Sequence, residues 1–244
     1  MTTRTKSPTT PTDQQIYDRI YLAILERRLQ PGVHLRENDL ATMFGVGRTK
    51  VRQALVKLVE VGVVQVERNR GASVAAPTKR EAKQVFDLRT MLEPAIAASL
   101  AGQHTPGQIA RLRAHIAEEE AARHNRDEAL LIRLTGEFHL LLAAQLGNKL
   151  IDRLLKGLEA LTCLSILSYS KRDASACLPH EHIEILDAVA AGETVKVSTL
   201  MATHLDHVRN DLDLEERATP EHDLVAALGL GAHRPAKRRR GKVA

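Results

Sequence analysis

Three histidines lie where the sequence predicts the buried faces of three separate helices. His139, His182 and His204 each share a helical face with apolar residues three, four or seven positions away. Imidazole nitrogens are good ligands for divalent transition metals, and three of them meeting in a helical bundle would form a metal site. A histidine on one apolar face is also compatible with an ordinary core residue, and spacing alone does not show whether the three helices meet. The pattern therefore predicts a candidate metal site and leaves the core alternative open.

A second group of chemically active residues lies at the start of a predicted helix. Arg48, Thr49, Lys50 and Arg52 cluster there, and the two arginines are four residues apart, on one helical face. Donors in the first turns of a helix can reach base edges in the major groove, where arginine pairs bidentately with guanine. A solvated basic helix in some other small domain is the alternative. We interpret this group as a double-stranded DNA contact.

The elements around the basic group follow a recognisable order. Gly45 stands where a helix exit needs a left-handed residue, and Pro31 and Gly32 mark a helix stop and turn. The expected elements are a helix from Asp13 to before Pro31, a helix capped by Asn38 and ending at Phe44, a helix from the basic group to about Val61, and strands over 63–66 and 72–75 around a polar turn. This is the order of a winged helix-turn-helix, whose contacts would extend to Arg36 and to the wing residues Arg68, Arg70 and Gly71.

The rest of the chain follows an almost entirely helical pattern. Breaks near residues 105–107, 124–125, 147–148, 173–179 and 192 divide it into six or seven helices, which favours a bundle. We therefore expect a mainly α fold, with an N-terminal winged helix-turn-helix and a C-terminal all-helical bundle. The expected division is a disordered arm over 1–11, a DNA-binding domain over 12–77, a helical domain over 78–218 and a basic disordered tail over 219–244.

Charge is distributed unevenly along the 244 residues. Residues 1–80 contain 14 Lys and Arg against 7 Asp and Glu, a net charge of +7, whereas residues 81–233 contain 15 against 23, a net of −8. Residues 234–244 add six positive charges. A basic front segment on an acidic body predicts that the front segment meets a polyanion. The tail would add either nonspecific phosphate affinity or solubility.

Several classes of protein are disfavoured by what the sequence lacks. It has no basic-then-apolar leader and no apolar run near the roughly 20 residues of a membrane helix. Its two cysteines, Cys163 and Cys177, form no disulfide or CxxC pattern, as in a reducing cytosol. It has no glycine-rich phosphate loop, HExxH motif or nucleophile elbow. We expect a cytoplasmic protein without a membrane partner and without catalytic residues.

Two segments resemble the DNA-binding head of GntR-type regulators. They are Leu-Gln-Pro-Gly-Val-His-Leu-Arg-Glu-Asn-Asp-Leu-Ala over 29–41 and Phe-Gly-Val-Gly-Arg-Thr-Lys-Val-Arg-Gln-Ala-Leu over 44–55. The second departs from the usual family pattern by having Gly47 for serine, Lys50 for proline and Gln53 for glutamate. The departures predict an altered set of operator contacts. The resemblance implies Arg48, Thr49 and Arg52 as the principal contacts, assisted by the wing tip near Gly71.

The second half of the chain, over roughly residues 80–215, resembles the FCD-type effector domain of the FadR branch of that family. The matching segments are Glu-Phe-His over 137–139, Gly-Asn over 147–148, Glu-His-Ile-Glu-Ile-Leu over 181–186 and His-Leu over 204–205. In metal-binding members of that branch, three histidines and one aspartate hold a divalent ion, often zinc or nickel. The resemblance assigns the three histidine positions to His139, His182 and His204.

Thr135 stands where the family aspartate is expected, four residues before His139. A hydroxyl is a weaker ligand than a carboxylate. The site could be three histidines completed by water and effector, a weak metal site, or a metal-free polar pocket. Arg89 lies where the family's first bundle helix offers a cation to the pocket. It could clamp an effector carboxylate, or form an ion pair with Asp87 or Glu93.

These observations together predict a ligand-responsive transcription regulator. We expect a homodimer that places two heads on a palindromic operator, with repression relieved by a small organic acid. One alternative is a DNA-binding protein whose helical domain only dimerises. The other is a metal-dependent enzyme, which the absence of catalytic motifs disfavours.

Overall fold

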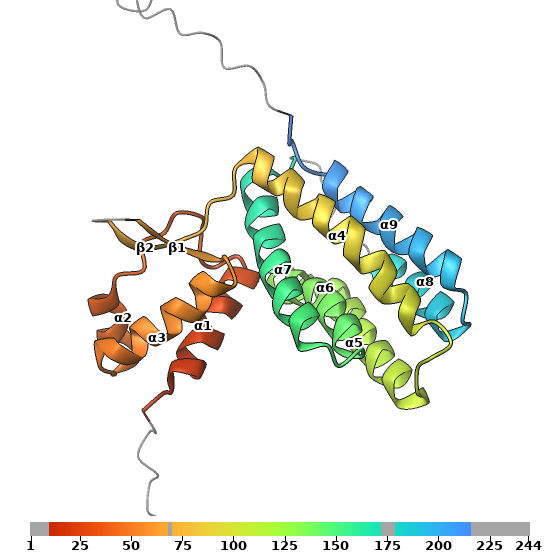
Figure 1. Ribbon diagram of the computed structural model, residues 1–244, viewed down its shortest axis with the longest axis horizontal. Helices are drawn as coiled ribbons and strands as arrows, with labels where there is room; N and C mark the ends of the chain where they lie inside the picture. The colour runs from red at the N-terminus through yellow and green to blue at the C-terminus, as the bar shows by residue number, and fades with distance from the viewer. Residues whose placement is uncertain (1–9, 68–69, 172–178, 216–244) are drawn as a thin grey trace, which may run out of the picture. The chain divides into compact units, whose positions relative to one another are not determined.

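A computed structural model describes residues 10–67, 70–171 and 179–215 (Figure 1). The described part contains nine helices and one two-stranded sheet, which confirms the predicted mainly α fold. Most of the expected arm, the basic tail over 219–244, Arg68 and Cys177 lie outside the described residues.

Helix α1, Asp13–Leu25, opens the winged-helix head. Thr12 and Gln15 form a capping box that satisfies backbone N–H groups at its start. Ile16, Ile20 and Ile24 repeat every four residues on one face of this helix, and all three are buried.

The helix-turn-helix is formed by α2, Glu37–Phe44, and α3, Arg48–Glu60. Gly45 ends α2 in the left-handed conformation, with φ 63°, as predicted. The prediction that Asn38 caps α2 was wrong. The helix begins two residues earlier than an Asn38 cap would place it, and its N-cap is Arg36, which makes no side-chain capping bond. Asn38 therefore lies within the first helical turn, where its side chain is exposed.

The wing consists of β1, Val64–Glu67, and β2, Gly71–Val74, which pair antiparallel with Val64 opposite Val74. Each strand is displaced by one residue from its predicted range. The hairpin extends the head's core, because Val64 and Val74 are buried against the helices.

The remaining helices form a bundle, and the breaks between them fall where the sequence predicts. The helices are α4 (Lys79–Leu100), α5 (Pro106–His124), α6 (Glu128–Ala144), α7 (Lys149–Tyr169), α8 (Pro179–Ala190) and α9 (Thr194–Asn210). Helix α4 packs along α9 and also contacts α7, while α6 packs against both α5 and α7. None of the described helices combines the length and apolar character needed to cross a membrane.

Helix α7 belongs to the bundle but also completes the core of the head. Ala160, Cys163 and Leu164 pack in the same apolar cluster as α1 and α3. The Tyr21 hydroxyl donates a 2.8 Å hydrogen bond to the carbonyl oxygen of Lys156 on α7. Helix α7 therefore joins the two predicted functional regions through side-chain packing.

Candidate functional site

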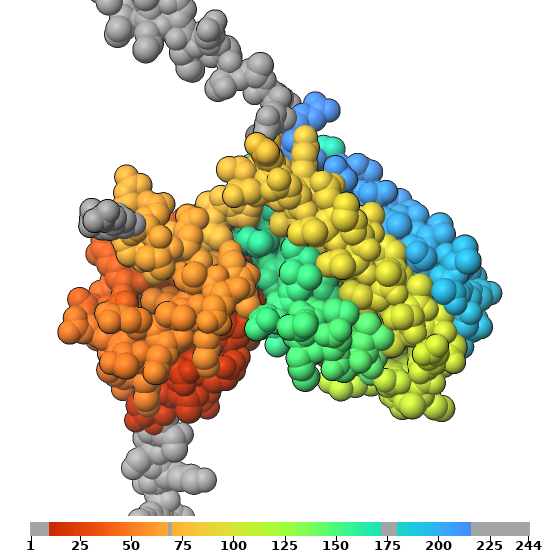
Figure 2. All heavy atoms as spheres, viewed as in Figure 1, coloured from red at the N-terminus to blue at the C-terminus, as the bar shows by residue number. Residues whose placement is uncertain are grey.

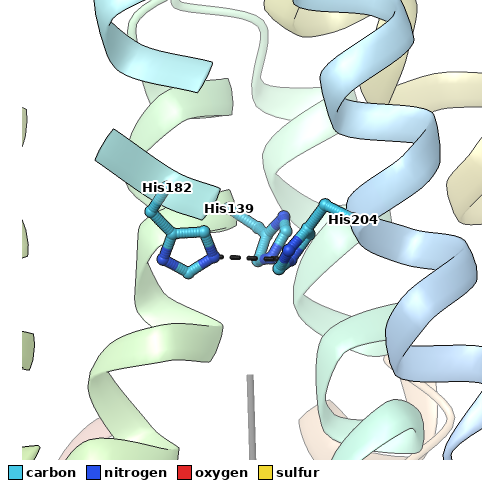
Figure 3. A group of neighbouring side chains, drawn as sticks. All are labelled: His139, His182 and His204. Atoms are coloured by element: carbon cyan, nitrogen blue, oxygen red, sulfur yellow. Dashed lines mark hydrogen bonds between the residues drawn. The ribbon is translucent and has the colours of Figure 1, made fainter. Parts of the chain in front are cut away.

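The three predicted histidines meet in the centre of the bundle (Figure 3). His139 comes from α6, His182 from α8 and His204 from α9, and all three are buried. Nε2 of His204 lies 3.3 Å from Nε2 of His139 and 3.4 Å from Nε2 of His182. Phe138 stacks on the ring of His182 with centroids 4.0 Å apart, which fixes the orientation of that imidazole.

A carboxylate holds the other nitrogen of each ring. Nδ1 of His139 lies 2.6 Å from Glu93, Nδ1 of His182 lies 2.8 Å from Glu119, and Nδ1 of His204 lies 2.7 Å from Glu181. A neutral imidazole has one N–H, and an acceptor oxygen facing Nδ1 places it there. Burial raises the pKa of Glu119 to about 9, so near neutral pH His182 faces a neutral carboxylic acid, whereas Arg89 and His139 keep Glu93 ionised. Each Nε2 therefore presents a lone pair to the other two rings. Carboxylates that orient histidines in this way are a regular feature of metal sites.

Three lone pairs facing one another repel unless a cation lies among them, and the Nε2 separations fit such an ion. Two nitrogens at about 2.0–2.1 Å from a tetrahedral zinc ion stand about 3.3–3.4 Å apart. The separations of 3.3 and 3.4 Å agree with this value. The three histidines therefore have the donor atoms that a divalent ion requires, with all three ligand atoms within 4.8 Å of one another, and His204 has the spacing to share an ion with each of the other two.

Burial keeps two of these imidazoles uncharged and available as ligands. It lowers the pKa of His139 to about 4, although Glu93 partly opposes the change. The same cause lowers the pKa of His182 well below its ordinary value, and the neighbouring His204 adds to the shift. A neutral imidazole is the form that binds a metal. Near neutral pH the site needs no proton loss from these two rings before a metal binds.

Among the described residues, no carboxylate joins the three imidazoles as a fourth ligand. Thr135, which replaces the aspartate of the resemblance, is buried on α6 and donates its hydroxyl proton to the Ile132 carbonyl oxygen at 3.1 Å. Thr135 lines a cavity of about 380 Å³ together with His139 and His204. This volume falls within the range of about 300–1,000 Å³ typical of small-molecule sites.

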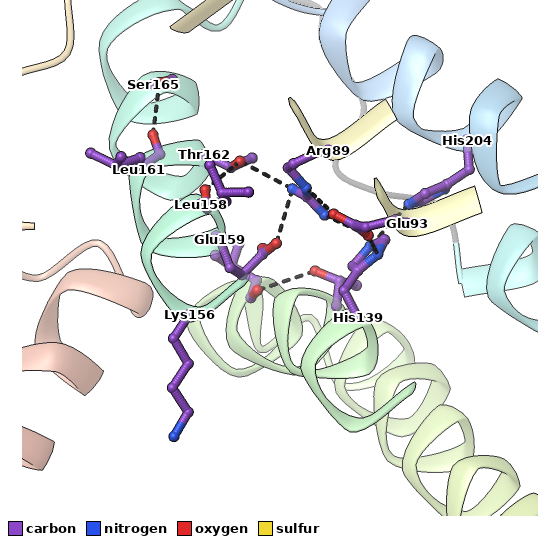
Figure 4. Close-up of polar contacts among 12 residues, drawn as sticks. Arg89, Glu93, His139, Lys156, Leu158, Glu159, Leu161, Thr162, Ser165 and His204 are labelled. Carbon is purple, nitrogen blue, oxygen red and sulfur yellow. Dashed lines mark hydrogen bonds and ion pairs between the residues drawn. The ribbon is translucent and has the colours of Figure 1, made fainter. Parts of the chain in front are cut away.

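Arg89 also lines this cavity, but its charge is already balanced (Figure 4). Its Nε and Nη2 approach the two carboxylate oxygens of Glu93 at 2.5 and 3.4 Å. Its Nη1 lies 2.9 Å from Glu159 and donates a 3.0 Å bond to Thr162. Of the two ion-pair partners suggested by the sequence, Glu93 is present, but the pair is buried rather than on the surface.

The two acids beside Arg89 are affected differently by its charge. Burial alone would raise the pKa of Glu93, but Arg89 and His139 reverse this and hold it well below its usual range. Burial raises the pKa of Glu159 to about 7, with Arg89 only partly opposing it. A Cβ on Gly136 would approach Glu159 Oε1 to 2.6 Å, so the glycine makes room for this side chain.

The basic group lies on the head, on the solvent-facing side of α3. Arg48, Thr49 and Arg52 are exposed, and Lys50 is half-buried with its Nζ 3.4 Å from the Pro11 carbonyl oxygen. The opposite side of α3 is buried, where Val51, Leu55 and Leu58 follow one another at helical spacing. Gly47 caps α3 without a side-chain bond, and of the first-turn N–H groups Lys50 donates to the Gly47 carbonyl oxygen at 3.1 Å, which leaves those of Arg48 and Thr49 able to bind a phosphate.

The other predicted DNA contacts lie at the edges of this surface. Arg36 and Arg70 are exposed, and Arg70 pairs with Glu67 at 3.1 Å. Gly71 begins β2 with φ 80°, a conformation that favours glycine at the wing. Glu37 forms a bidentate pair with Arg52 at 2.9 and 2.8 Å, which the sequence analysis did not predict.

Several residues of the site were not recognised from the sequence. Glu119 and Glu159 lay in no motif that pointed to the site, and Glu93 was considered only as an ion-pair partner of Arg89, four residues before it, not as a partner of His139. Arg27 belongs to the head but lines the cavity. No sequence motif around Arg27 predicts a ligand-binding role for it. The hydrophobic pattern on a single helix does not show which side chain enters a neighbour's core.

Two family profiles match the chain. The profile described as "Bacterial regulatory proteins, gntR family" matches residues 12–74, and the FCD domain profile matches residues 84–207. The first match covers the head and the second covers the bundle helices that carry the three histidines.

Curated relatives and solved structures agree with these matches. The HTH-type transcriptional repressor RspR of Escherichia coli K12 is 26% identical over 210 residues, which cover 85% of this chain and 92% of RspR. A GntR protein from Rhodococcus sp. RHA1 has the same fold, with a TM-score of 0.72 at 24% identity over 84% of this chain and 99% of that one. The fold of E. coli McbR/YncC is also similar, with a TM-score of 0.70 at 19% identity over 81% and 95% of the two chains.

Proposed function

Because the chain belongs to the gntR family of bacterial regulatory proteins and carries an FCD domain, we propose that it is a repressor released from its operator by a small-molecule effector. The basic surface of α3 binds the DNA, and the cavity of the bundle binds the effector. The relative RspR is named a transcriptional repressor, and this supports the sign of the response. An effector changes DNA affinity only if it binds one arrangement of the heads better than the other.

The bundle would hold a divalent ion, zinc or nickel, through Nε2 of His139, His182 and His204. The observation that carries this proposal is the convergence of three buried Nε2 atoms whose Nδ1 atoms all face carboxylates. When bound, the ion supplies a Lewis-acidic position at which an oxygen ligand can coordinate. The protein's own side chains orient the rings and keep bulk water away from them.

The effector would be a small organic acid bound in the cavity next to these histidines. Thr135 brings no negative charge to the cavity, whereas an aspartate at this position would repel an incoming carboxylate. Arg89 lines the same cavity, and in our proposal its guanidinium helps to balance the effector's charge, in exchange for part of its contact with Glu159. The volume of about 380 Å³ suits a molecule of this class.

The protein would act as a homodimer. Leu88 and Met91 on α4 and Leu150 and Leu154 on α7 are exposed apolar side chains. The two helices are in contact, and both reach the surface on the face drawn in Figure 2. Exposed apolar residues on neighbouring helices are typical of protein–protein interfaces. A two-fold interface here would pair two heads for a palindromic operator.

Fluorescence anisotropy with a fragment of the protein's own promoter tests DNA binding. We expect sequence-selective binding that weakens steeply as the salt concentration rises, because α3 and the wing would neutralise phosphates. Binding to a scrambled fragment with equal affinity would contradict the proposal.

Metal analysis after exhaustive dialysis tests the sensing site. The wild type should retain close to one equivalent of zinc or nickel, and the His139→Ala/His182→Ala double variant should retain none. His124→Ala is a suitable control, because His124 lies at the exposed end of α5. A protein that binds operator DNA but no metal, and whose affinity no ligand changes, would instead have a purely dimerising bundle.

A further inference from the structure

Arg27 belongs to the head by sequence but lies at the cavity of the bundle. It follows α1 by two residues, and its side chain lines the cavity together with Arg89, Thr135 and His139. Every other residue that lines this cavity comes from α4 or from later in the chain. The head therefore contributes one side chain, a cation, to the cavity.

The guanidinium of Arg27 has an unmet hydrogen-bonding capacity. Its Nε is buried and has no hydrogen-bond partner among the described residues, and no ion pair of Arg27 is found in that part of the chain. Burial lowers the pKa of Arg27, although Cys163 and Glu128 oppose the change. Arg89 differs, because Glu93 and Glu159 both pair with it. A buried donor without a partner is unfavourable unless a ligand satisfies it.

The backbone of Arg27 ends α1. Its φ is 55°, the left-handed conformation in which a chain commonly leaves a helix, and the Arg28 N–H donates to the Ala23 carbonyl oxygen; Arg126 ends α5 in the same way with φ 56°. Glycine would fit this position without strain.

We propose that Arg27 is an effector-binding residue supplied by the DNA-binding head, and that the effector's carboxylate accepts hydrogen bonds from its guanidinium. This inference rests on the proposed function, because it assumes an anionic effector in the cavity. The bound anion then contacts the helical domain through the site beside His139 and His204, and the head through Arg27. It links the two regions directly.

Such a bridge explains how occupancy of the cavity would be transmitted to the DNA-binding surface. The head rests on α7 through the Tyr21–Lys156 hydrogen bond and through Gly157, where a Cβ would come within 2.5 Å of the Val61 carbonyl oxygen. An anion bound to Arg27 adds a charged contact to this junction. It therefore favours the arrangement in which Arg27 lies at the cavity over any arrangement in which the head has moved away.

The test uses acetate as a carboxylate probe and acetamide as its uncharged counterpart. Saturation-transfer NMR measures the binding of each to full-length protein supplied with equimolar zinc, at constant ionic strength. We expect the wild type to prefer acetate, and Arg27→Gly to bind acetate about tenfold more weakly, because one charge-assisted hydrogen bond is lost. Arg28→Ala is the matched control, since Arg28 is exposed, pairs with Glu26 and does not line the cavity.

The variants separate a ligand role from a structural one. Glycine accepts a φ of 55°, so Arg27→Gly should melt no lower than the wild type, and Arg27→Asn offers a second side chain that tolerates this conformation. Acetate should change the operator affinity of the wild type and of Arg28→Ala, but not that of Arg27→Gly.

The possible outcomes test the role of Arg27 and the proposed carboxylate effector separately. If Arg27→Gly and Arg27→Asn bind acetate as tightly as the wild type, the assignment of Arg27 is wrong and the proposed function stands. If the wild type does not distinguish acetate from acetamide, the carboxylate effector itself is refuted, and the role of Arg27 is refuted with it.

Discussion

Two arginine–glutamate pairs with similar geometry lie in the two functional regions of this protein. On the head, Arg52 and Glu37 form two contacts of 2.9 and 2.8 Å, and in the bundle, Arg89 and Glu93 form two of 2.5 and 3.4 Å. The side chains of the first pair are 67% and 33% exposed, and those of the second are 3% and 4% exposed. The contact distances therefore do not distinguish the two pairs, but their exposure to solvent does.

The difference in burial gives the two pairs different roles. Water screens the exposed pair, so Arg52 can exchange Glu37 for a phosphate or a base at little loss of stability. The buried pair has no water to replace a lost partner, so each of its charges depends on the other. The head is therefore suited to exchange ligands on its surface, whereas the bundle is suited to hold the histidines in one geometry.

The largest expected effect is on the buried pair. Arg89→Leu leaves Glu93 and Glu159 without their cation, and we expect it to lower the free energy of unfolding by about 3–5 kcal/mol. Urea denaturation followed by circular dichroism measures the loss. Arg113→Leu is the control, because it removes an exposed pair with Asp187 and should change stability by about 1 kcal/mol or less. Equal effects of the two substitutions would remove the distinction between the regions.

The second effect depends on pH and concerns Glu159. Its folded-state pKa of about 7 lies above its ordinary value of 4.5, so the unfolded chain ionises first. The wild type should therefore lose stability relative to Glu159→Gln as the pH rises from about 4.5 to 7, with no further loss above that range. At about 1.4 kcal/mol per pKa unit, the difference should approach 3 kcal/mol. Parallel stability curves for the two proteins between pH 4.5 and 7 would show that Glu159 does not titrate in this way.

The third effect concerns Arg52 on the head, where we expect a large change in DNA binding and a small change in stability. Arg52→Leu should weaken operator binding by about 1–3 kcal/mol, because it removes a principal contact, but change the free energy of unfolding by about 1 kcal/mol or less. Anisotropy titrations and urea denaturation of the same preparation measure both quantities. A large loss of stability would mean that the Arg52–Glu37 pair supports the fold rather than DNA binding.

The smallest effect concerns one carboxylate behind the histidines. In Glu119→Gln, the amide cannot ionise to balance the charge of a bound metal and can turn a donor instead of an acceptor toward Nδ1 of His182, so metal affinity should fall by about 10- to 100-fold. Competition with a chromogenic chelator measures the change. Glu118→Gln, one residue away and exposed, should leave metal affinity unaltered. If both variants bind metal like the wild type, the carboxylate does not orient His182.

The sequence predicted the head more completely than the site in the bundle. The order of helices, the left-handed Gly45 and the buried side of α3 follow from neighbouring residues, because each depends on contacts within a few turns of chain. The Asn38 cap was the exception there, since a favourable N-cap residue type does not fix the residue at which the backbone becomes helical. In the bundle, the breaks and the inward faces of His139, His182 and His204 were predictable for the same local reason.

The sequence by itself thus determined a winged helix-turn-helix with a basic α3 and a bundle with three inward histidines, because hydrophobic periodicity and turn residues act locally. Only the tertiary structure decided that the three Nε2 atoms converge, that Glu93, Glu119 and Glu181 stand behind them, and that the charge of Arg89 is balanced while Arg27 reaches the cavity from the head. The contacts of the three imidazoles join residues 22 to 65 positions apart in the chain. The packing of the six bundle helices buries these contacts, and their burial makes a lost partner costly.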